Sequence, residues 1–416
     1  MMRATDLLRT SFLSNLLAYG ASEVVAKFSR LFVVIVVART LGVAEIGVAA
    51  AALAICEIFK GLTENGIGQR IIAAPAQQLN AICVKAHQLF WASCLGLFAL
   101  QVALAVLLAG LGFVEVSLLV ALAALEYLFM PAGLVQAALA VREGKLKQTA
   151  AIAGVQVLTA NALSVALVFI IPSALVLILP RVLTAPLWLL SMRRLRPWSR
   201  PSEVTASPTR PFLRYGIPVL GVELVKMLRL HADKLIAGAL LGAEGLGLYF
   251  MAFNAGLSLV TSFIAAFEKV VFPQLCTTQN GRFGPRSIAV AGLALIAPFV
   301  IAQSLFASVY VPLLLGPGWQ EIVPVVQILC LTALPLTIWS VAAAQLRVTG
   351  QPEIEFLVTL AVTFGLAVSA WVFAPFGVLA MAMGYVAALS ITLLVASVLV
   401  MFSGVTFPTV LQNQEI

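Results

Sequence analysis

The sequence predicts an all-α polytopic membrane protein with about twelve transmembrane helices in two pseudo-symmetric six-helix bundles. Of its 416 residues, 62% are hydrophobic and only 10% are charged, whereas a soluble protein carries about a quarter charged residues. Apolar stretches long enough to cross a bilayer follow one another from Asn15 to Phe402. The segment Leu41–Gly47 is echoed at Leu241–Gly247. Two similar halves of this kind are typical of a transporter whose halves rock about a central site.

The apolar stretches give the expected spans in chain order. The first is interpreted as a retained helix, because the residues before it contain no small-residue cleavage site. The twelve expected spans are 15–38, 46–68, 84–111, 115–141, 149–171, 174–192, 212–240, 247–272, 287–314, 322–346, 355–374 and 377–402.

A basic, proline-rich segment at 193–211 separates the two expected halves, an N-terminal bundle at 1–192 and a C-terminal bundle at 212–416. It contains four prolines, and a polar sequence of this kind cannot continue a helix but makes a semi-rigid connector. We therefore expect a linker between the halves.

Basic residues gather at one set of span ends, and the opposite ends are mostly acidic. Lys and Arg near span ends are retained in the cytoplasm, so both termini are expected to be cytoplasmic. The net charge of +8 then follows from topology, and we expect no nucleic-acid partner.

Charged residues inside the expected spans are the candidate functional residues, because a charge at mid-bilayer is costly unless it is paired or faces water. Spacings of three and four place the charges of a span on one helical face, so we expect these faces to converge on a polar lumen. The candidate lumen cations are Lys27, Arg30, Lys60, Arg181, Lys226 and Arg229. The candidate anions that orient them or bind a coupling ion are Glu23, Glu57, Glu64, Glu223 and Asp233.

The same charges also fit a purely structural role, because cations and anions are nearly balanced when Glu126 and Lys234 are included. Pairs such as Glu57 or Glu64 with Lys27 or Arg30 would then hold helices together. Arg181 has no acidic neighbour in its own span, so it is the cation expected to be most available to a substrate anion.

The five cysteines form no CxxC pair and no cluster with histidine, so no metal site or disulfide is expected. The sequence has no Walker motif or dinucleotide fingerprint, so ATP-driven transport by this chain alone is not supported. We expect no cofactor, and coupling to H⁺, to Na⁺ or to no ion remains open.

A set of short motifs resembles bacterial polysaccharide flippases of the multidrug/oligosaccharidyl-lipid/polysaccharide exporter superfamily. The second half carries a pattern of Asp, Lys, Leu-Gly and Leu-Gly-Leu-Tyr, and the first half carries its companion. The matching segments are Ala38–Gly42, Glu64–Ile67, Asp233–Ile236, Leu241–Gly242, Leu246–Tyr249, Ala252, Phe272–Leu275, Leu315–Gly316, Trp319, Gln345 and Gly350. The chain departs from the family pattern at Val48, often an aromatic residue, and at Asn65, often an aspartate.

This resemblance implies a V-shaped pair of bundles that alternates its opening in the bacterial inner membrane. It implies a polyprenyl-diphosphate-linked oligosaccharide as substrate, flipped from the cytoplasmic to the periplasmic leaflet for O-antigen, capsule or exopolysaccharide synthesis. Membrane lipid surrounds such a protein, and a polysaccharide polymerase machinery is a further expected partner.

Two other functions stay open. A drug or metabolite exporter of the same superfamily would share the architecture but prefer an acidic lumen for cationic drugs. A polysaccharide polymerase or ligase would be an enzyme, but such enzymes usually carry a long outer loop, and the outer connections here are short. The sequence therefore favours a non-enzymatic transporter.

Overall fold

The fold is taken from a computed structural model, which describes residues 28–63, 66–201, 204–277 and 284–402. The candidate site residues Glu23, Lys27 and Glu64 lie outside these ranges, as does Asn65. The chain divides into two compact units, Met1–His231 and Ala232–Ile416, here called the N-terminal unit and the C-terminal unit.

The described residues contain helices and no strand. In the N-terminal unit, residues 28–40 are helical and precede α2 (Val43–Gly61), α3 (Ile67–Ile72), α4 (Leu79–Gly110), α5 (Val114–Ala124), α6 (Glu126–Phe129), α7 (Pro131–Arg142), α8 (Leu146–Val168) and α9 (Leu179–Leu195). Helix α10 (Arg210–Thr277) contributes to both units. The C-terminal unit continues with α11 (Pro285–Leu315), α12 (Val323–Cys330), α13 (Ala333–Val348), α14 (Pro352–Phe373) and α15 (Val378–Phe402).

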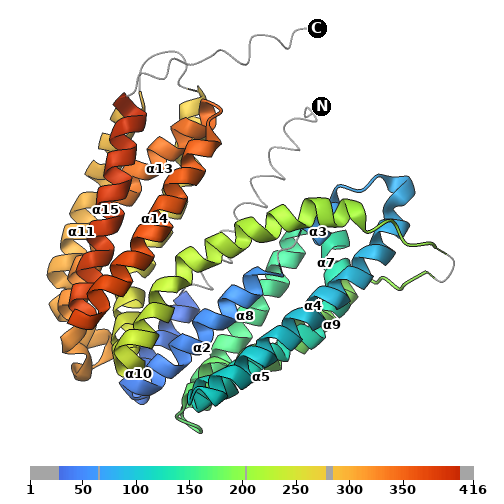
Figure 1. Cartoon of the computed structure of the whole chain (residues 1–416), viewed down its shortest axis with the longest axis horizontal. Coiled ribbons are helices and arrows are strands. Elements are labelled where there is room, and N and C mark those ends of the chain that lie inside the picture. Colours follow the sequence, from blue (N-terminus) through green and yellow to red (C-terminus); the bar gives the residue numbers. More distant parts are fainter. Residues whose placement is uncertain (1–27, 64–65, 202–203, 278–283, 403–416) are drawn as a thin grey trace, which may run out of the picture. The chain divides into compact units, whose positions relative to one another are not determined.

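Within the N-terminal unit, α4 packs along α5, and α8 packs along α9 (Figure 1). One buried apolar cluster joins α3, α4 and α7 around Ile71, Phe90 and Val135, and it includes Phe212 from the start of α10. A second cluster joins α2, α4 and α5 around Ala52 and Val120. These small and branched side chains allow the helices of the bundle to approach closely.

Within the C-terminal unit, α15 packs against α12, α13 and α14 (Figure 1). Val362 and Leu366 of α14 are buried with Leu389 and Leu393 of α15. These residues recur at intervals of four, so they form one face of each helix.

The remaining faces of the long helices are apolar and exposed, as expected for side chains in contact with lipid. Leu100, Val106 and Leu107 of α4 are more than half exposed, and so are Leu305 and Phe306 of α11. The span that contains α4 has a mean hydropathy of 2.3 although only 17% of its most apolar window is buried. The chain is a multi-pass membrane protein.

By length and composition, the described residues contain eight helices able to cross a membrane, or nine when a bent pair is counted as one span. The count of twelve therefore stays a prediction. Helix α2 is not among the eight, and it carries Glu45, Glu57 and Lys60. The bent pair is Val114–Phe129 with Pro131–Arg142, which meet at 55°. A proline at this point removes one helical hydrogen bond and clashes with the preceding turn, so the helix bends.

The repeated Leu-Gly motif marks a helix break in both halves. Gly42 lies between the helix at 28–40 and α2, with φ −69° and ψ 154°. Gly242 interrupts α10 with φ 71° and ψ −172°, a conformation open essentially to glycine alone. The sequence echo therefore corresponds to an echo in structure, although the two glycines adopt different conformations.

We expect Gly242→Ala to lower the free energy of unfolding by about 1–3 kcal/mol, because alanine is strained at this φ and ψ. Gly221→Ala is a matched control, since Gly221 is helical and a Cβ there would meet nothing within 4 Å. It should leave stability unchanged or raise it slightly. Thermal unfolding of the two purified variants tests this prediction. Equal melting temperatures would contradict the conclusion that the backbone at Gly242 requires glycine.

Candidate functional site

Four charged side chains of the N-terminal unit form two ion pairs. Arg181 Nη2 donates to Glu57 Oε1 at 2.6 Å, and Lys60 Nζ donates to Glu126 Oε1 at 3.3 Å. Glu57 and Lys60 lie three residues apart on α2 and so share one face. The four formal charges of this cluster cancel.

Helix breaks position the partners of the two α2 residues. Glu126 begins the four-residue helix α6, which lies between the end of α5 and the bend at Pro131. Arg181 lies in the first turn of α9, directly after Pro180. Proline is well tolerated in a first turn, where its missing N–H is not needed. Both partners thus come from helix ends inside the bundle.

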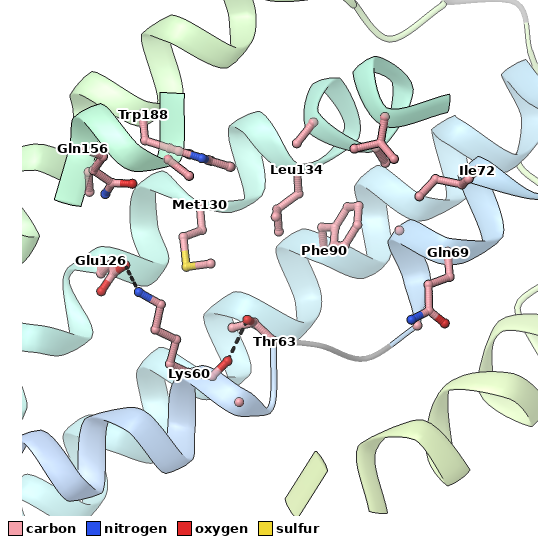
Figure 2. Close-up of a pocket in the computed structure, with 18 of the residues that line it drawn as sticks. Lys60, Thr63, Gln69, Ile72, Phe90, Glu126, Met130, Leu134, Gln156 and Trp188 are labelled. Carbon is pink, nitrogen blue, oxygen red and sulfur yellow. Dashed lines mark hydrogen bonds and ion pairs between the residues drawn. The ribbon is translucent and has the colours of Figure 1, made fainter. Parts of the chain in front are cut away.

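The cluster borders a cavity of about 660 Å³ in the N-terminal unit (Figure 2). Glu57, Lys60 and Glu126 are among its lining residues. Their side chains are 39%, 42% and 15% exposed, so both α2 residues can be reached from the cavity despite their pairing. The cavity is therefore lined by charged side chains whose charges are neutralised by their own ion pairs.

The rest of the cavity wall mixes polar and apolar side chains. Thr63, Gln69 and Gln156 provide hydrogen-bonding groups, and Trp188 and Met130 provide apolar surface (Figure 2). Polar groups with an aromatic side chain suit a sugar, whose hydroxyls need hydrogen bonds while its ring faces are apolar.

The first part of α10 closes one side of this cavity through close contacts at two glycines. A Cβ on Gly61 would lie 2.3 Å from Met227 Cγ, and one on Gly66 would lie 2.8 Å from Tyr215. The Tyr215 hydroxyl donates a hydrogen bond to Gln69 Oε1. Gly66 also has a φ of 74°, so this wall depends on glycine for both space and conformation.

The prediction that Arg181 is the most available cation is wrong, because its guanidinium bonds Glu57. Sequence proximity could not reveal this partner, since the two residues are 124 positions apart. The pair is nevertheless only partly buried, with 23% of the Arg181 side chain exposed. Arg181 remains close to the cavity through Glu57, which lines it.

The other described candidates do not line this cavity. Lys226 pairs with Glu223 of its own helix at 3.1 Å, and both Arg30 and Arg229 are exposed. A lumen role for these residues stays a prediction. The structure adds Glu126 to the cluster as the partner of Lys60, whereas the sequence pattern presents Glu126 only as one of the anions that balance the cations.

Asp233 belongs to a separate polar cluster in the C-terminal unit. Lys234 Nζ lies 3.2 Å from Asp233 Oδ1, and the Tyr249 hydroxyl donates to Asp233 Oδ2 at 2.9 Å. The Lys234 ammonium also lies 4.0 Å from the centroid of the Phe253 ring. Asp233 is 4% exposed and Lys234 is 7% exposed. This cluster is a closed ion pair, buried in contact with the aromatic side chains of Tyr249 and Phe253.

A known protein-family model matches the part of the chain that contains this cavity. The model, described as "Polysaccharide biosynthesis protein", matches residues 36–324. A segment of 148 residues is 25% identical to the amylovoran biosynthesis protein AmsL of Erwinia amylovora and covers 35% of this chain and 38% of that protein. A segment of 159 residues is 24% identical to the lipopolysaccharide biosynthesis protein WzxC of Escherichia coli K12, covering 37% and 32%. The matches thus span about a third of the length of these curated relatives.

Solved structures with a similar fold cover nearly the whole chain. The lipid II flippase MurJ in an inward closed conformation has a TM-score of 0.75 at 12% identity, covering 94% of this chain and 88% of that one. An inward-facing multidrug resistance transporter of the MATE family has a TM-score of 0.65 at 16% identity, covering 90% and 93%. At these identities the likeness shows the fold alone.

Proposed function

This chain belongs to the family of polysaccharide biosynthesis proteins, and we propose that it flips a polyprenyl-diphosphate-linked oligosaccharide from the cytoplasmic to the periplasmic leaflet by alternating access. The observation that carries the proposal is the charged cavity of about 660 Å³ inside a bundle whose outer faces are apolar. A diphosphate and its sugars cannot be solvated by lipid, whereas a hydrated, charged cavity accepts both.

Lys60 and Arg181 are the proposed diphosphate ligands. Charge-assisted hydrogen bonds to phosphate are among the strongest in proteins, and a guanidinium can bind two phosphate oxygens at once. An ammonium has three donors, so Lys60 can bind a phosphate oxygen while it holds Glu126. Arg181 can do so by exchanging Glu57 for the substrate.

Charge balance gives this exchange a second consequence. In the structure the cations neutralise Glu57 and Glu126, so the cavity avoids the penalty of an unpaired charge. When a diphosphate takes over the cations, the carboxylates lose their counter-charge. Uptake of H⁺ or Na⁺ by one of them would restore the balance, and we propose cation coupling on this basis.

The neutral part of the cavity wall is proposed to bind the sugars nearest the diphosphate. Thr63, Gln69 and Gln156 can bond hydroxyls, and Trp188 can lie against a sugar ring. The polyprenyl tail would stay in the bilayer. The proposal places both termini in the cytoplasm, the chain in a bacterial inner membrane, and a polymerase machinery downstream, with no reaction catalysed by the chain itself.

The lipid-linked intermediates of a deletion strain test this function. With the glycosyltransferases intact, loss of the gene should cause completed polyprenyl-diphosphate oligosaccharide to accumulate on the cytoplasmic leaflet, and the wild-type gene should relieve it. Completed units that reach the periplasm but stay unpolymerised would replace the proposal by a polymerase or ligase. An unchanged pool with altered drug sensitivity would replace it by an exporter.

A further inference from the structure

The first part of the linker packs against the N-terminal unit. Gln136 Nε2 donates to the Trp198 carbonyl at 3.4 Å, and Arg193 Nε donates to the Ala132 carbonyl at 3.2 Å. The Trp198 ring lies 5.3 Å from the His87 ring, measured between centroids. The last turn of α9 and the residues that follow it are therefore held against the surface of the bundle.

These contacts border a second cavity, of about 580 Å³, which is open at the protein surface and shares no lining residue with the first. Its lining residues include two arginines, Arg193 and Arg200. They also include the aromatic side chains of His87 and Trp198 and the neutral polar side chains of Gln136 and Ser199. Among the described residues that line it, none is acidic. The cavity thus presents positive charge and hydrogen-bond donors without a built-in counter-ion.

Glu143 is the acidic residue that contacts this part of the linker, and its carboxylate is already paired with two cations that do not line the cavity. Lys145 and Arg196 both contact it. The hydrogen bond from Lys145 and, to a smaller extent, the one from Arg196 hold the pKa of Glu143 below its ordinary value. Glu143 is therefore ionised and engaged by residues that do not line the cavity.

The cavity lies near one end of the bundle. His87 is eight residues beyond the start of α4 at Leu79, or roughly 12 Å along the helix axis, and Arg193 is in the last turn of α9. This end carries the basic residues of the connections, which favours the cytoplasmic side of a membrane. Trp and Arg at this depth are placed to meet lipid headgroups, and the cytoplasmic leaflet is anionic.

We propose that this second cavity binds the phosphate group of an anionic lipid headgroup, held by Arg193 and Arg200 with Trp198 against the rest of the headgroup. Guanidinium groups suit phosphate because their planar donors match two of its oxygens. Arg193 donates a hydrogen bond from Nε to the Ala132 carbonyl, and its two terminal nitrogens can bind the phosphate. The cavity is larger than a phosphate needs, so it accommodates an attached glycerol or sugar.

Native mass spectrometry of the full-length protein tests the proposal with three probes: phosphatidylglycerol, undecaprenyl diphosphate and, as the zwitterionic reference, phosphatidylcholine. The variant is Arg193→Gln/Arg200→Gln. The matched control is Arg194→Gln/Arg214→Gln, which removes the same charge from exposed positions that do not line the cavity. All four side chains are exposed, so both variants should fold.

The wild-type protein should bind an anionic probe more tightly than phosphatidylcholine. The Arg193/Arg200 variant should lose about tenfold or more in that affinity, while the control should retain it. Equal losses for both anionic probes, or a loss confined to phosphatidylglycerol, would support a site for anionic lipid headgroups. A loss confined to undecaprenyl diphosphate would overturn it in favour of a site for the polyprenyl-linked substrate. An equal loss in the control, or binding of phosphatidylcholine as tight as that of both anionic probes, would overturn the proposal. The proposal does not rest on the flippase function, because phosphatidylglycerol is not that function's substrate.

Discussion

Lys234→Met is expected to lower the free energy of unfolding by about 3–5 kcal/mol, because it leaves Asp233 as a buried charge without its cation. The Asp233 carboxylate is 4% exposed, and its described partners are the Lys234 ammonium and the Tyr249 hydroxyl. The melting temperature of the purified protein should fall by roughly 6–20 °C, the shift expected for a unit of this size.

Lys226→Met provides the matched control for this prediction. Lys226 also pairs with an acidic residue of α10, but its side chain is 52% exposed. An exposed pair contributes about 1 kcal/mol or less, so its loss should change the melting temperature little. The double variant Asp233→Asn/Lys234→Met should recover much of the loss, since no buried charge remains. Equal melting temperatures for the Lys226 and Lys234 variants would contradict the closed ion pair.

Arg181→Ala is expected to abolish flipping while the protein is still made and inserted. The change removes a proposed diphosphate ligand and leaves Glu57 at the cavity without the guanidinium that now bonds it at 2.6 Å. Both effects place net negative charge where a diphosphate must bind. Complementation of the deletion strain should fall by about a hundredfold or more, the effect of losing a bidentate charged contact together with an unpaired carboxylate.

A second variant separates the functional from the structural role of this pair. Glu57→Ala/Arg181→Ala removes both charges, so its expression and melting temperature should return towards wild type while flipping stays absent. Arg194→Ala is the control for loss of a cation elsewhere, and it should complement. Full complementation by Arg181→Ala would defeat the assignment of Arg181 as a ligand. Restored flipping in the double variant would reduce the pair to a structural contact.

The fold class and the helix breaks could be predicted from the sequence because both depend on local pattern. Apolar stretches of spanning length are visible in the composition alone. The echo of Leu41–Gly47 at Leu241–Gly247 corresponds to real breaks at Gly42 and Gly242. The different conformations of these two glycines could not be predicted, because the φ and ψ of a glycine depend on how the flanking helices pack.

The partners within the charged cluster could be predicted only in part. Helical spacing places Glu57 and Lys60 on one face, and this is a local property of α2. Their partners are 124 and 66 positions away, and the helix ends just before Pro131 and at Pro180 decide which charges meet. No periodicity encodes such distances, so the sequence predicts an available Arg181, whereas the structure pairs it with Glu57.

The C-terminal cluster illustrates the same limit. Asp233 and Tyr249 are 16 positions apart on either side of the break at Gly242. A continuous helix would separate them by about 24 Å along its axis. The break is what allows the hydroxyl to reach the carboxylate, so the glycine of the repeat and the buried ion pair are linked.

Reconstituted flipping in vesicles tests the proposed function of this protein. The purified protein would be placed in vesicles carrying a fluorescent polyprenyl-diphosphate oligosaccharide, and the fraction reached by a membrane-impermeant quencher would be followed over time. We expect wild-type protein to move the substrate between leaflets, the Arg181→Ala variant not to move it, and a neutral fluorescent lipid to stay in place. Substrate that remains in its original leaflet, with folded wild-type protein inserted in the vesicles and an H⁺ or a Na⁺ gradient applied, would refute the proposed flippase function.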